Sequence, residues 1–429
     1  MSKTVIHPAA NILGSLRLPG DKSISHRYAM LAALASGRSR FHNFSTGADC
    51  ASTLDCLRHL GAKVQHDREQ HIVDIEGCGG RLRQPAATLD CGNSGSTLRM
   101  LSGILAGQPI ECELAGDESL SRRPMGRVIV PLRQMGAQIK AGPQDRAPVH
   151  IRGGKLHGIH YQPEVASAQV KSALLFAGLQ AKGETVVEEP HATRDHGELA
   201  LRAFGAEITR EKRRTSIQGG QSLHGFEGMV PGDASSAAFF LCAAAIFPES
   251  NLVIEGVLMN PTRAALLDVM ASLGAKVKIL QLEDQQGELV GTVKIESGVL
   301  QGALIESGQS AALIDELPVL AAIAPYTRDG IEIRDARELR IKESDRIALV
   351  AKNLLAMGAS VEEREDGLRV PGQQALHGAE IDSGGDHRIA MAFSIAALRA
   401  NGESTIDGSE AASVSFPEFY QMLDQIIER

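Results

Sequence analysis

A short phrase that occurs five times along the chain limits the fold more than any other feature of the sequence. Each copy consists of a large apolar residue, Gly-Ala, one variable residue, and Val or Ile. The copies are Leu60–Val64, Met135–Ile139, Phe204–Ile208, Leu273–Val277 and Met357–Val361. The glycine suits the left-handed residue that follows a helix, and the pattern after it is typical of a strand. Because the glycines lie 75, 69, 69 and 84 residues apart, each copy marks a whole supersecondary unit.

Each unit also contains an earlier helix. This helix begins at a polar segment rich in Gly, Ser or Asp, which we call its opening. The six openings are Lys22–Ser23, Asn93–Thr97, Ser167–Gln169, Gly232–Ser235, Ser310–Asp315 and Gly384–Arg388. The sixth unit stops after its second predicted helix, Pro417–Ile427, and has no strand pair of its own. We expect two N-terminal strands, Thr4–Ile6 and Ile12–Leu18, to complete it, so that the two chain ends meet in one domain.

The phrase Pro-Gly-Asp-x-Ser marks two points where we expect the chain to cross between domains. It occurs at Pro19–Ser23 and Pro231–Ser235, and the two copies bracket three units. A chain of 429 residues is too long for one core, and domains of about 200 residues are its natural division. The prediction is an α/β (α+β) fold with an inserted domain, 21–230, and a second domain, 1–20 plus 231–429. The alternative to a repeated unit is a set of unrelated helices that each end at a glycine. Five matched copies of the phrase argue against this alternative.

Composition and charge restrict the class of partner and the compartment. The net charge of −8 argues against general binding to nucleic acid or to a membrane surface, and favours a small partner. Six cysteines are scattered without a Cys-x-x-Cys pair, so we expect reduced core residues rather than a zinc or redox site. The segment Met1–Gly14 lacks a secretory apolar region, and the longest apolar run, Ala237–Phe247, is too short to span a bilayer. We therefore expect a cytoplasmic protein.

The first helix opening, Pro19–Arg27, carries a cation on each side of the helix start. Ser23 is a candidate N-cap, Lys22 lies just outside the helix, and Arg27 lies one turn in, on the same face as Ser23. A helix start offers unpaired N–H groups and the positive end of the helix dipole. The segment therefore predicts a cradle for a small anion. The open alternative is a capped helix with two solvated cations.

Cations also recur at the other openings. The nine that lie in Gly-rich, Ser-rich or turn-rich phrases are Lys22, Arg27, Arg99, Arg123, Lys171, Arg194, Lys342, Arg346 and Arg388. If the six helices open toward one cleft, each N-terminus adds a positive field worth about 0.3–1 kcal/mol. We therefore predict a polyanionic ligand, although a solvated surface position is an open alternative for any single cation.

Two acidic residues are candidates for proton transfer. Asp315 lies in the apolar segment Ala311–Pro318, and Glu343 lies between Lys342 and Arg346. An apolar environment and a position between basic residues shift the pKa of a carboxyl group in opposite directions. One site can therefore contain both a base and an acid. Either residue could instead be an N-cap or an ion-pair partner.

Five phrases spread over the whole chain together carry a family resemblance. They are Pro19–Arg27, Gly92–Arg99, Arg122–Met125, Arg340–Arg346 and Asp386–Arg388. They resemble the signatures of the EPSP (5-enolpyruvylshikimate-3-phosphate) synthase family of enolpyruvyl transferases. The resemblance implies two domains, each of three βαβαββ units, with helix N-termini converging on an interdomain cleft that closes on the substrates. It also implies transfer of the enolpyruvyl group of phosphoenolpyruvate to shikimate 3-phosphate, the sixth step of the shikimate pathway, without cofactor or metal.

The resemblance further implies the site residues. Those implied to hold shikimate 3-phosphate are Ser23, Arg27, Ser167, Gln169, Arg194, Asp315 and Lys342, with Ala168 beside them. Those implied to hold phosphoenolpyruvate are Lys22, Gly95, Arg123, Gln169, Arg346 and Arg388. The guanidinium group of Arg can form two parallel hydrogen bonds to phosphate or carboxylate oxygens, whereas Ser and Gln can form hydrogen bonds with hydroxyl groups. We expect Asp315, Glu343 and Lys22 to be catalytic. Because no long heptad or large apolar stripe demands a partner, we expect a monomer.

One departure from the family pattern and two rival functions remain. Many family members have a Lys where Val414 precedes Ser415–Pro417, so one phosphate contact is in doubt. The related transferase that acts on UDP-N-acetylglucosamine carries a Cys shortly before an Arg-Pro pair, and Asp117–Ser121 contains none. A non-catalytic binder of anions or RNA ends would need basic and aromatic surface, which four Tyr and no Trp do not favour.

Overall fold

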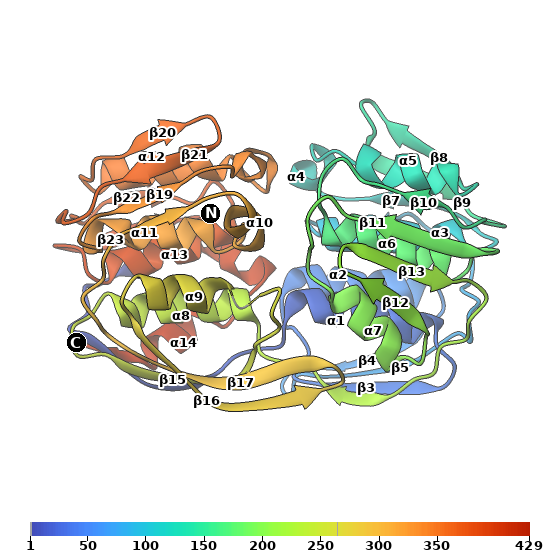
Figure 1. Cartoon of the computed structure of the whole chain (residues 1–429), viewed down its shortest axis with the longest axis horizontal. Helices are drawn as coiled ribbons and strands as arrows, with labels where there is room; N and C mark the ends of the chain where they lie inside the picture. The colour runs from blue at the N-terminus through green and yellow to red at the C-terminus, as the bar shows by residue number, and fades with distance from the viewer. Residues whose placement is uncertain (1, 264) are drawn as a thin grey trace. The chain divides into compact units, whose positions relative to one another are not determined.

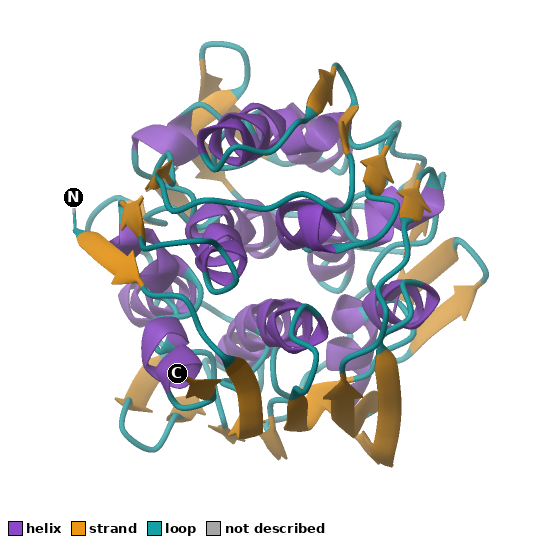
Figure 2. Cartoon of the chain, turned by 90° about the vertical axis from the view of Figure 1, so that its left-hand side faces the viewer, coloured by secondary structure: helices purple, strands orange, loops and turns teal. Residues whose placement is uncertain are grey.

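The computed structural model describes residues 2–263 and 265–429, and these form two compact units. Unit 1 comprises Met1–Pro19, Pro231–Asp284 and Leu289–Arg429, and unit 2 comprises Gly20–Val230 and Gln285–Glu288. Both units mix helices and strands, which confirms the α/β fold class. Within each unit the strands lie toward the outside and the helices lie inside (Figures 1 and 2).

Unit 2 contains three four-stranded sheets with the same construction. In each sheet the first strand is parallel to the second, which pairs antiparallel with one strand of a hairpin. The first sheet consists of β14 (Glu227–Met229), β3 (Arg38–His42), β5 (Ile72–Glu76) and β4 (Lys63–Asp67). The second consists of β6 (Leu89–Asp90), β7 (Glu111–Ala115), β9 (Arg146–Arg152) and β8 (Gln138–Gly142). The third consists of β10 (His160–Tyr161), β11 (Glu184–Glu188), β13 (Arg214–Gln218) and β12 (Ile208–Glu211).

The helices of unit 2 fall into two classes. The inner helices α1 (Lys22–Leu34), α3 (Gly95–Ala106) and α6 (Ala168–Gly178) are buried along most of their length. The outer helices are α2 (Ala48–His59), α4 (Glu118–Ser121), α5 (Gly126–Gln134) and α7 (His196–Ala203). A Cβ atom on Gly103 would lie 2.1 Å from the Ala173 carbonyl oxygen, so α3 and α6 approach as closely as backbones allow.

Unit 1 contains one sheet of five strands, one of four and one of three. The first consists of β16 (Lys276–Gln285), β17 (Glu288–Glu296), β15 (Asn251–Leu258), β2 (Asn11–Arg17) and β24 (Ile427–Glu428). The second consists of β18 (Ala303–Ile305), β19 (Ile331–Ile333), β21 (Gly367–Val370) and β20 (Glu362–Arg364). The third consists of β1 (Lys3–Ile6), β23 (Ser404–Asp407) and β22 (Glu380–Asp382).

The two N-terminal strands exist, but they join different sheets. β1 pairs with β23 of the sixth repeat, as predicted, whereas β2 lies between β15 and β24. The prediction that both complete the sixth repeat was therefore wrong for the second strand, because β2 supplies the parallel strand that β15 needs. β2 precedes α1 of unit 2 but belongs to unit 1, and β14 precedes α8 of unit 1 but belongs to unit 2.

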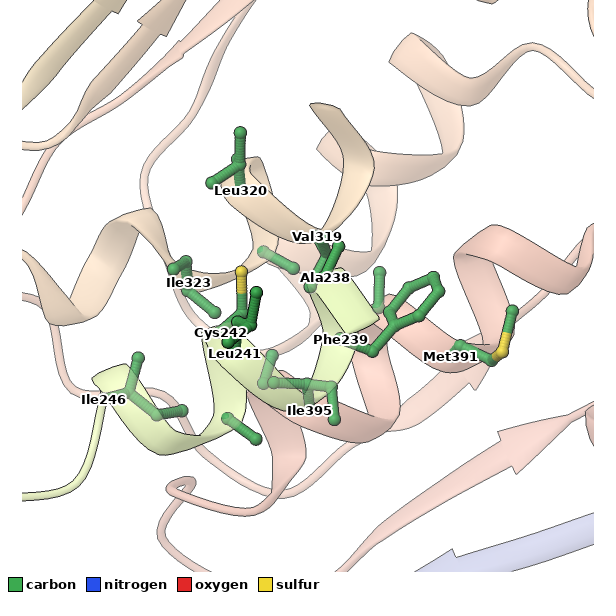
Figure 3. Close-up of a cluster of buried hydrophobic side chains, with 14 of the residues drawn as sticks. Ala238, Phe239, Leu241, Cys242, Ile246, Val319, Leu320, Ile323, Met391 and Ile395 are labelled. Carbon is green, nitrogen blue, oxygen red and sulfur yellow. The ribbon is translucent and has the colours of Figure 1, made fainter. Parts of the chain in front are cut away.

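Three inner helices form the core of unit 1. They are α8 (Ala234–Ala245), α11 (Leu317–Ile323) and α13 (His387–Ala397), and their side chains meet in Figure 3. The other helices are α9 (Ala265–Ser272), α10 (Gly308–Ala312), α12 (Arg346–Ala356) and α14 (Phe419–Asp424). Three 3-10 turns also occur, η1 (Ala324–Tyr326), η2 (Arg337–Ile341) and η3 (Ser409–Val414). The last predicted helix, Pro417–Ile427, is shortened because the chain end forms β24.

The five repeated glycines behave as the sequence predicts. Each follows an outer helix, and its φ lies between 84° and 107°. The five are Gly61, Gly136, Gly205, Gly274 and Gly358. A side chain at this left-handed φ would be strained, so glycine is needed wherever an outer helix ends and the chain turns into the next strand.

Replacing Phe240 by alanine is expected to lower the free energy of unfolding by about 3–5 kcal/mol. Phe240 is fully buried in α8, and its ring centroid lies 5.9 Å from those of Phe416 and Phe419. Urea unfolding measures the change. Leu355→Ala is the control, because Leu355 is 59% exposed and its loss should change stability by less than about 0.5 kcal/mol. A Phe240→Ala midpoint equal to that of the control would contradict this account of the core.

Candidate active site

In unit 2 the three inner helices begin with side-chain caps. The cap of α1 is Asp21, whose carboxylate accepts from the Ile24 N–H at 2.9 Å. The predicted cap, Ser23, is therefore wrong, because the helix begins two residues earlier than that cap requires. Lys22, expected just outside the helix, is its first residue, and Ser23 lies in its first turn. Ser94 caps α3 at 3.1 Å and Ser167 caps α6 at 3.4 Å, so all three helix starts are ordered by short polar side chains.

Arg27 joins α1 to α6. Its guanidinium donates to the Ser23 carbonyl at 2.8 Å and to the Ser172 hydroxyl at 2.9 and 3.1 Å, and it reaches the Ala168 carbonyl at 3.5 Å. Burial lowers the pKa of Arg27, the carboxylates of Glu198 and Asp21 raise it, and the charge of Arg194 lowers it again.

The structure therefore brings several predicted site residues of unit 2 together around the start of α6. Arg27 contacts Ser23 and Ala168, Ser167 caps the same helix, and Arg194 is near enough to act on the charge of Arg27. Ser172 was not predicted from the sequence. It lies within a helix of apolar and small residues, where no local pattern marks it as a partner of a distant arginine.

Lys22 has an anionic partner within its own unit. Its ammonium lies 2.9 Å from the Asp49 carboxylate, and the two side chains are 18% and 9% exposed. Asp49 belongs to the first turn of α2, and no pattern in the sequence marks it as the partner of Lys22. The pair holds the Lys22 side chain at the start of α1 while leaving part of it open to solvent.

A second cluster surrounds the start of α3. Arg99 donates to the Gln169 amide oxygen at 2.7 Å, and the Gln169 amide nitrogen donates to Ser96 at 2.9 Å. A Cβ atom on Gly95 would lie 2.9 Å from Arg99 Nη1 and 3.4 Å from Arg123 Nη1. The structure thus places Gly95 directly beside two guanidinium groups, and Gln169 links this cluster to α6.

Arg123 is positioned by polar side chains of the same unit. Its Nη2 donates to the Asn93 side-chain oxygen at 2.8 Å and to the Ser119 hydroxyl at 3.3 Å. Arg123 is 8% exposed, whereas the Arg122 side chain next to it is 69% exposed and pairs with Glu118. The two neighbouring arginines therefore have different environments, which makes Arg122 a matched control for Arg123.

Lys171 does not belong with the other cations. Its ammonium lies 2.9 Å from Glu189 and 2.7 Å from Glu198, and all three side chains are at most 3% exposed. The prediction of Lys171 as one of nine ligand-facing cations is wrong for this reason. Two buried carboxylates already engage it, and the sequence around Glu189 and Glu198 contains no pattern that indicates the pairing.

In unit 1, Arg346 is the centre of the charged cluster. The side chain is 1% exposed and contacts three carboxylates. Its Nε lies 2.8 Å from Asp386 Oδ2, its Nη2 lies 2.6 Å from Glu343 Oε2, and its Nη1 lies 3.8 Å from Asp315 Oδ1. Asp386 also accepts from the Ser344 hydroxyl at 2.9 Å. The two predicted acids therefore lie on the same guanidinium group.

Charge pairing dominates the ionisation of this cluster. Burial acts to lower the pKa of Arg346, but Asp386 and Glu343, followed by Asp315, raise it above its ordinary value. Burial likewise acts to raise the pKa of Asp386, but the charge of Arg346 lowers it below its ordinary value. Pairing therefore favours the charged form of both groups. Asp386 appeared in the sequence analysis only as part of a phrase, and burial is what reveals its importance.

Asp315 is more open than its partners and contacts two arginines. Its carboxylate is 18% exposed and lies 3.7 Å from Arg388 Nε, in addition to the Arg346 contact. Arg388 also donates to the Asp315 backbone carbonyl at 2.9 Å. Lys342 ends the 3-10 turn η2 and is half-buried, next to Glu343. The structure therefore brings Asp315, Glu343, Arg346 and Arg388 together, and Lys342 adjoins Glu343 in the sequence.

Other features of the described residues bear on the earlier expectations. All six cysteines are free thiols; five are buried and Cys78 is half-buried. Among residues 2–263 and 265–429, no helix is both long enough and apolar enough to cross a membrane. In the same residues, no group of three or more His, Cys, Asp or Glu side chains is arranged to hold a metal ion.

Comparison with known proteins gives a consistent result over the whole length. A family model described as EPSP synthase (3-phosphoshikimate 1-carboxyvinyltransferase) matches residues 6–423. A 3-phosphoshikimate 1-carboxyvinyltransferase of Koribacter versatilis is 61% identical over 429 residues, 100% of both chains. One of Solibacter usitatus is 55% identical and covers 99% of both chains.

Solved structures are similar as well. An EPSP synthase of Acinetobacter baumannii superposes with a TM-score of 0.89 at 40% identity, covering 100% of this chain and 98% of the other. The enolpyruvyl transferase NikO of Streptomyces tendae has a TM-score of 0.79 at 18% identity, covering 98% and 96% of the two chains. The second likeness supports the fold alone.

Proposed function

This chain belongs to the EPSP synthase family, and from that premise we propose how its own residues perform the reaction. The protein transfers the enolpyruvyl group of phosphoenolpyruvate to shikimate 3-phosphate in the shikimate pathway. We propose that the 5-hydroxyl oxygen adds to C2 of phosphoenolpyruvate while C3 gains a proton. Phosphate then leaves from the tetrahedral intermediate as C3 loses a proton, so that the vinyl group is restored.

The single observation that carries the assignment of roles is the Arg346 cluster. Asp315 and Glu343 both contact Arg346, yet each keeps 17–18% of its side chain exposed, whereas Asp386 is fully buried. The first two carboxylates can therefore meet a substrate, and Asp386 serves as the permanent counter-ion. We propose that Asp315 accepts the proton of the 5-hydroxyl and that Glu343 delivers and removes the proton at C3, assisted by Lys22.

The remaining residues are proposed to bind the two anionic substrates. Those assigned to shikimate 3-phosphate are Ser23, Arg27, Ser167, Gln169, Arg194, Asp315 and Lys342, with Ala168 beside them. Those assigned to phosphoenolpyruvate are Lys22, Gly95, Arg123, Gln169, Arg346 and Arg388. The support is chemical, because guanidinium groups bind phosphate and carboxylate oxygens in pairs and the helix starts favour anions. Release of inorganic phosphate from a mixture of the two substrates tests the function, and UDP-N-acetylglucosamine in place of shikimate 3-phosphate should release none.

Arg123→Ala should raise the Michaelis constant for phosphoenolpyruvate by about 10- to 150-fold, since a charge-assisted hydrogen bond contributes about 1.5–3 kcal/mol. The constant for shikimate 3-phosphate should change far less, because Arg123 lies beside Gly95 rather than in the Arg27 cluster. Steady-state kinetics with each substrate varied in turn gives both values. Arg122→Ala is the control and should behave as the unmodified enzyme. Equal effects on the two constants would show that Arg123 is assigned to the wrong substrate.

A monomeric state and a cytoplasmic location complete the proposal. The net charge of −8 and the absence of Trp support an enzyme of two small anionic substrates rather than a binder of nucleic acid or membrane surfaces. Light scattering after gel filtration measures the mass in solution, and a mass near twice 45.6 kDa would contradict the monomer.

A further inference from the structure

The second Pro-Gly-Asp-x-Ser phrase opens helix α8 in the same way as the first opens α1. Asp21 and Asp233 each accept from the backbone N–H three residues later, at 2.9 and 2.8 Å. Ser23 and Ser235 therefore occupy equivalent places in the first turns of their helices. The Ser23 cradle is assigned above to a substrate, which raises the question of what the Ser235 cradle holds.

A carboxylate of the chain itself occupies the second cradle. Ser235 Oγ donates to Glu316 Oε1, and Arg263 Nη2 lies 3.2 Å from the same oxygen and also donates to Ser235. Ser235 is 5% exposed, Arg263 is 7% exposed and Glu316 is 4% exposed, so Glu316 is shielded from solvent at the start of α8. By contrast, Ser23 is half-buried. The cradle in unit 1 is thus filled by an internal anion.

Glu316 directly follows Asp315 in a tight turn. The Glu316 N–H donates to the Leu313 carbonyl at 2.8 Å, and Arg388 donates to the Asp315 carbonyl at 2.9 Å. Leu313 and Leu317 on either side are buried. The backbone of Asp315 is consequently held by Arg388 on one side and by the anchored Glu316 side chain on the other. Both contacts act on the backbone from which the Asp315 carboxylate extends.

We propose that Glu316, bound by Ser235 and Arg263, is a positioning residue for Asp315. The internal carboxylate takes the place of an external anion at the α8 cradle and thereby sets the orientation of the neighbouring carboxylate. The inference rests on the proposed role of Asp315 as the base. It does not require Glu316 to touch a substrate.

Glu316→Ala provides a direct test, because the deleted group, CH₂–COO⁻, has the size of acetate. We expect kcat to fall by about 100-fold, the scale of a misplacement of roughly 1 Å, while both Michaelis constants change little. Added acetate should restore much of kcat in a concentration-dependent way. Acetamide, which has the same shape without the charge, should restore less. Glu316→Gln keeps an acceptor oxygen for Ser235 and should retain more activity than Glu316→Ala.

A second readout does not depend on activity. Acetate should raise the melting temperature of Glu316→Ala, since a ligand that binds only the folded state stabilises it, and should leave the unmodified protein unchanged. Glu365→Ala is the matched control, because Glu365 is 77% exposed and pairs with Arg337 at the surface. This variant should show neither a loss of kcat nor a response to acetate.

The outcomes separate this inference from the proposed function. If Glu316→Ala keeps its full kcat, or if acetate changes neither kcat nor the melting temperature, the inference is overturned. If Asp315→Asn keeps full turnover while acetate still stabilises Glu316→Ala, the role of Asp315 is wrong and the filled cradle stands. Should Glu316→Ala fail to fold, Ser235→Ala removes one donor instead; a lowered kcat with unchanged Michaelis constants then supports the inference, and an unchanged kcat overturns it.

Discussion

Replacing Asp315 by alanine should lower kcat by about 100- to 10,000-fold, the usual contribution of a general base. Asp315 is the partly exposed carboxylate that lies 3.7 Å from Arg388 and 3.8 Å from Arg346. In the proposed mechanism, its loss leaves the 5-hydroxyl of shikimate 3-phosphate without the group that accepts its proton as the C–O bond forms. Release of inorganic phosphate at saturating concentrations of both substrates measures the loss.

Substrate binding should survive this change better than turnover. In the proposed site the cationic residues supply most of the affinity for the two anions, and this change removes none of them. Titration of shikimate 3-phosphate into Asp315→Ala should therefore still give a binding isotherm. Asp315→Asn tests the charge at constant shape, and Asp329→Ala, at a side chain that is 64% exposed, is the control. A loss of less than about tenfold in kcat would remove Asp315 from the role of base.

Glu343→Gln should suppress exchange at C3 of phosphoenolpyruvate by a similar factor of about 100 to 10,000. Glu343 Oε2 lies 2.6 Å from Arg346 Nη2, and glutamine can keep an oxygen in that position while it cannot transfer a proton. Incubation with both substrates in deuterated solvent, followed by mass spectrometry, reports deuterium at C3. The unmodified enzyme should incorporate deuterium at that carbon.

Comparison of the two acids makes the assignment specific. Asp315→Asn should impair formation of the tetrahedral intermediate as a whole, whereas Glu343→Gln should act chiefly on the proton at C3. An enzyme with Glu343→Gln that exchanges C3 protons at the normal rate would require another acid, and Lys22 would then be the first candidate among the residues assigned above. Glu363→Gln is a useful control, because Glu363 pairs with Arg340 and is 43% exposed.

Much of the fold could be predicted because the repeats impose local geometry. A glycine at a helix end has to take a positive φ, and all five repeated glycines do so. The phrases at helix openings are equally local, since capping depends on residues three positions apart. For the same reason a shift of two residues was enough to misplace the cap of α1, which is Asp21 rather than Ser23.

Contacts between distant residues could not be predicted in this way. The sequence does not distinguish Lys171 from the other cations. Only the folded structure shows that Glu189 and Glu198 both pair with its ammonium group. The importance of Asp386 depends on its burial against Arg346, and the destination of β2 depends on which strand lacks a parallel neighbour. Each of these pairings joins segments that only the folded chain brings together.

Strand β2 belongs to unit 1 but precedes a helix of unit 2, and β14 belongs to unit 2 but precedes a helix of unit 1. This arrangement has a consequence for folding during synthesis. β2, at residues 11–17, is synthesised well before its neighbours in the sheet, β15 at 251–258 and β24 at 427–428. At about 5–20 residues per second, roughly 10–50 s separate the synthesis of β2 from that of β15, and β24 follows later. During that time nearly all of unit 2 is made and can fold, while β2 stays without its neighbours in the sheet. β2 therefore pairs late relative to its own synthesis, and its contact with β24 cannot form before residue 428 is made.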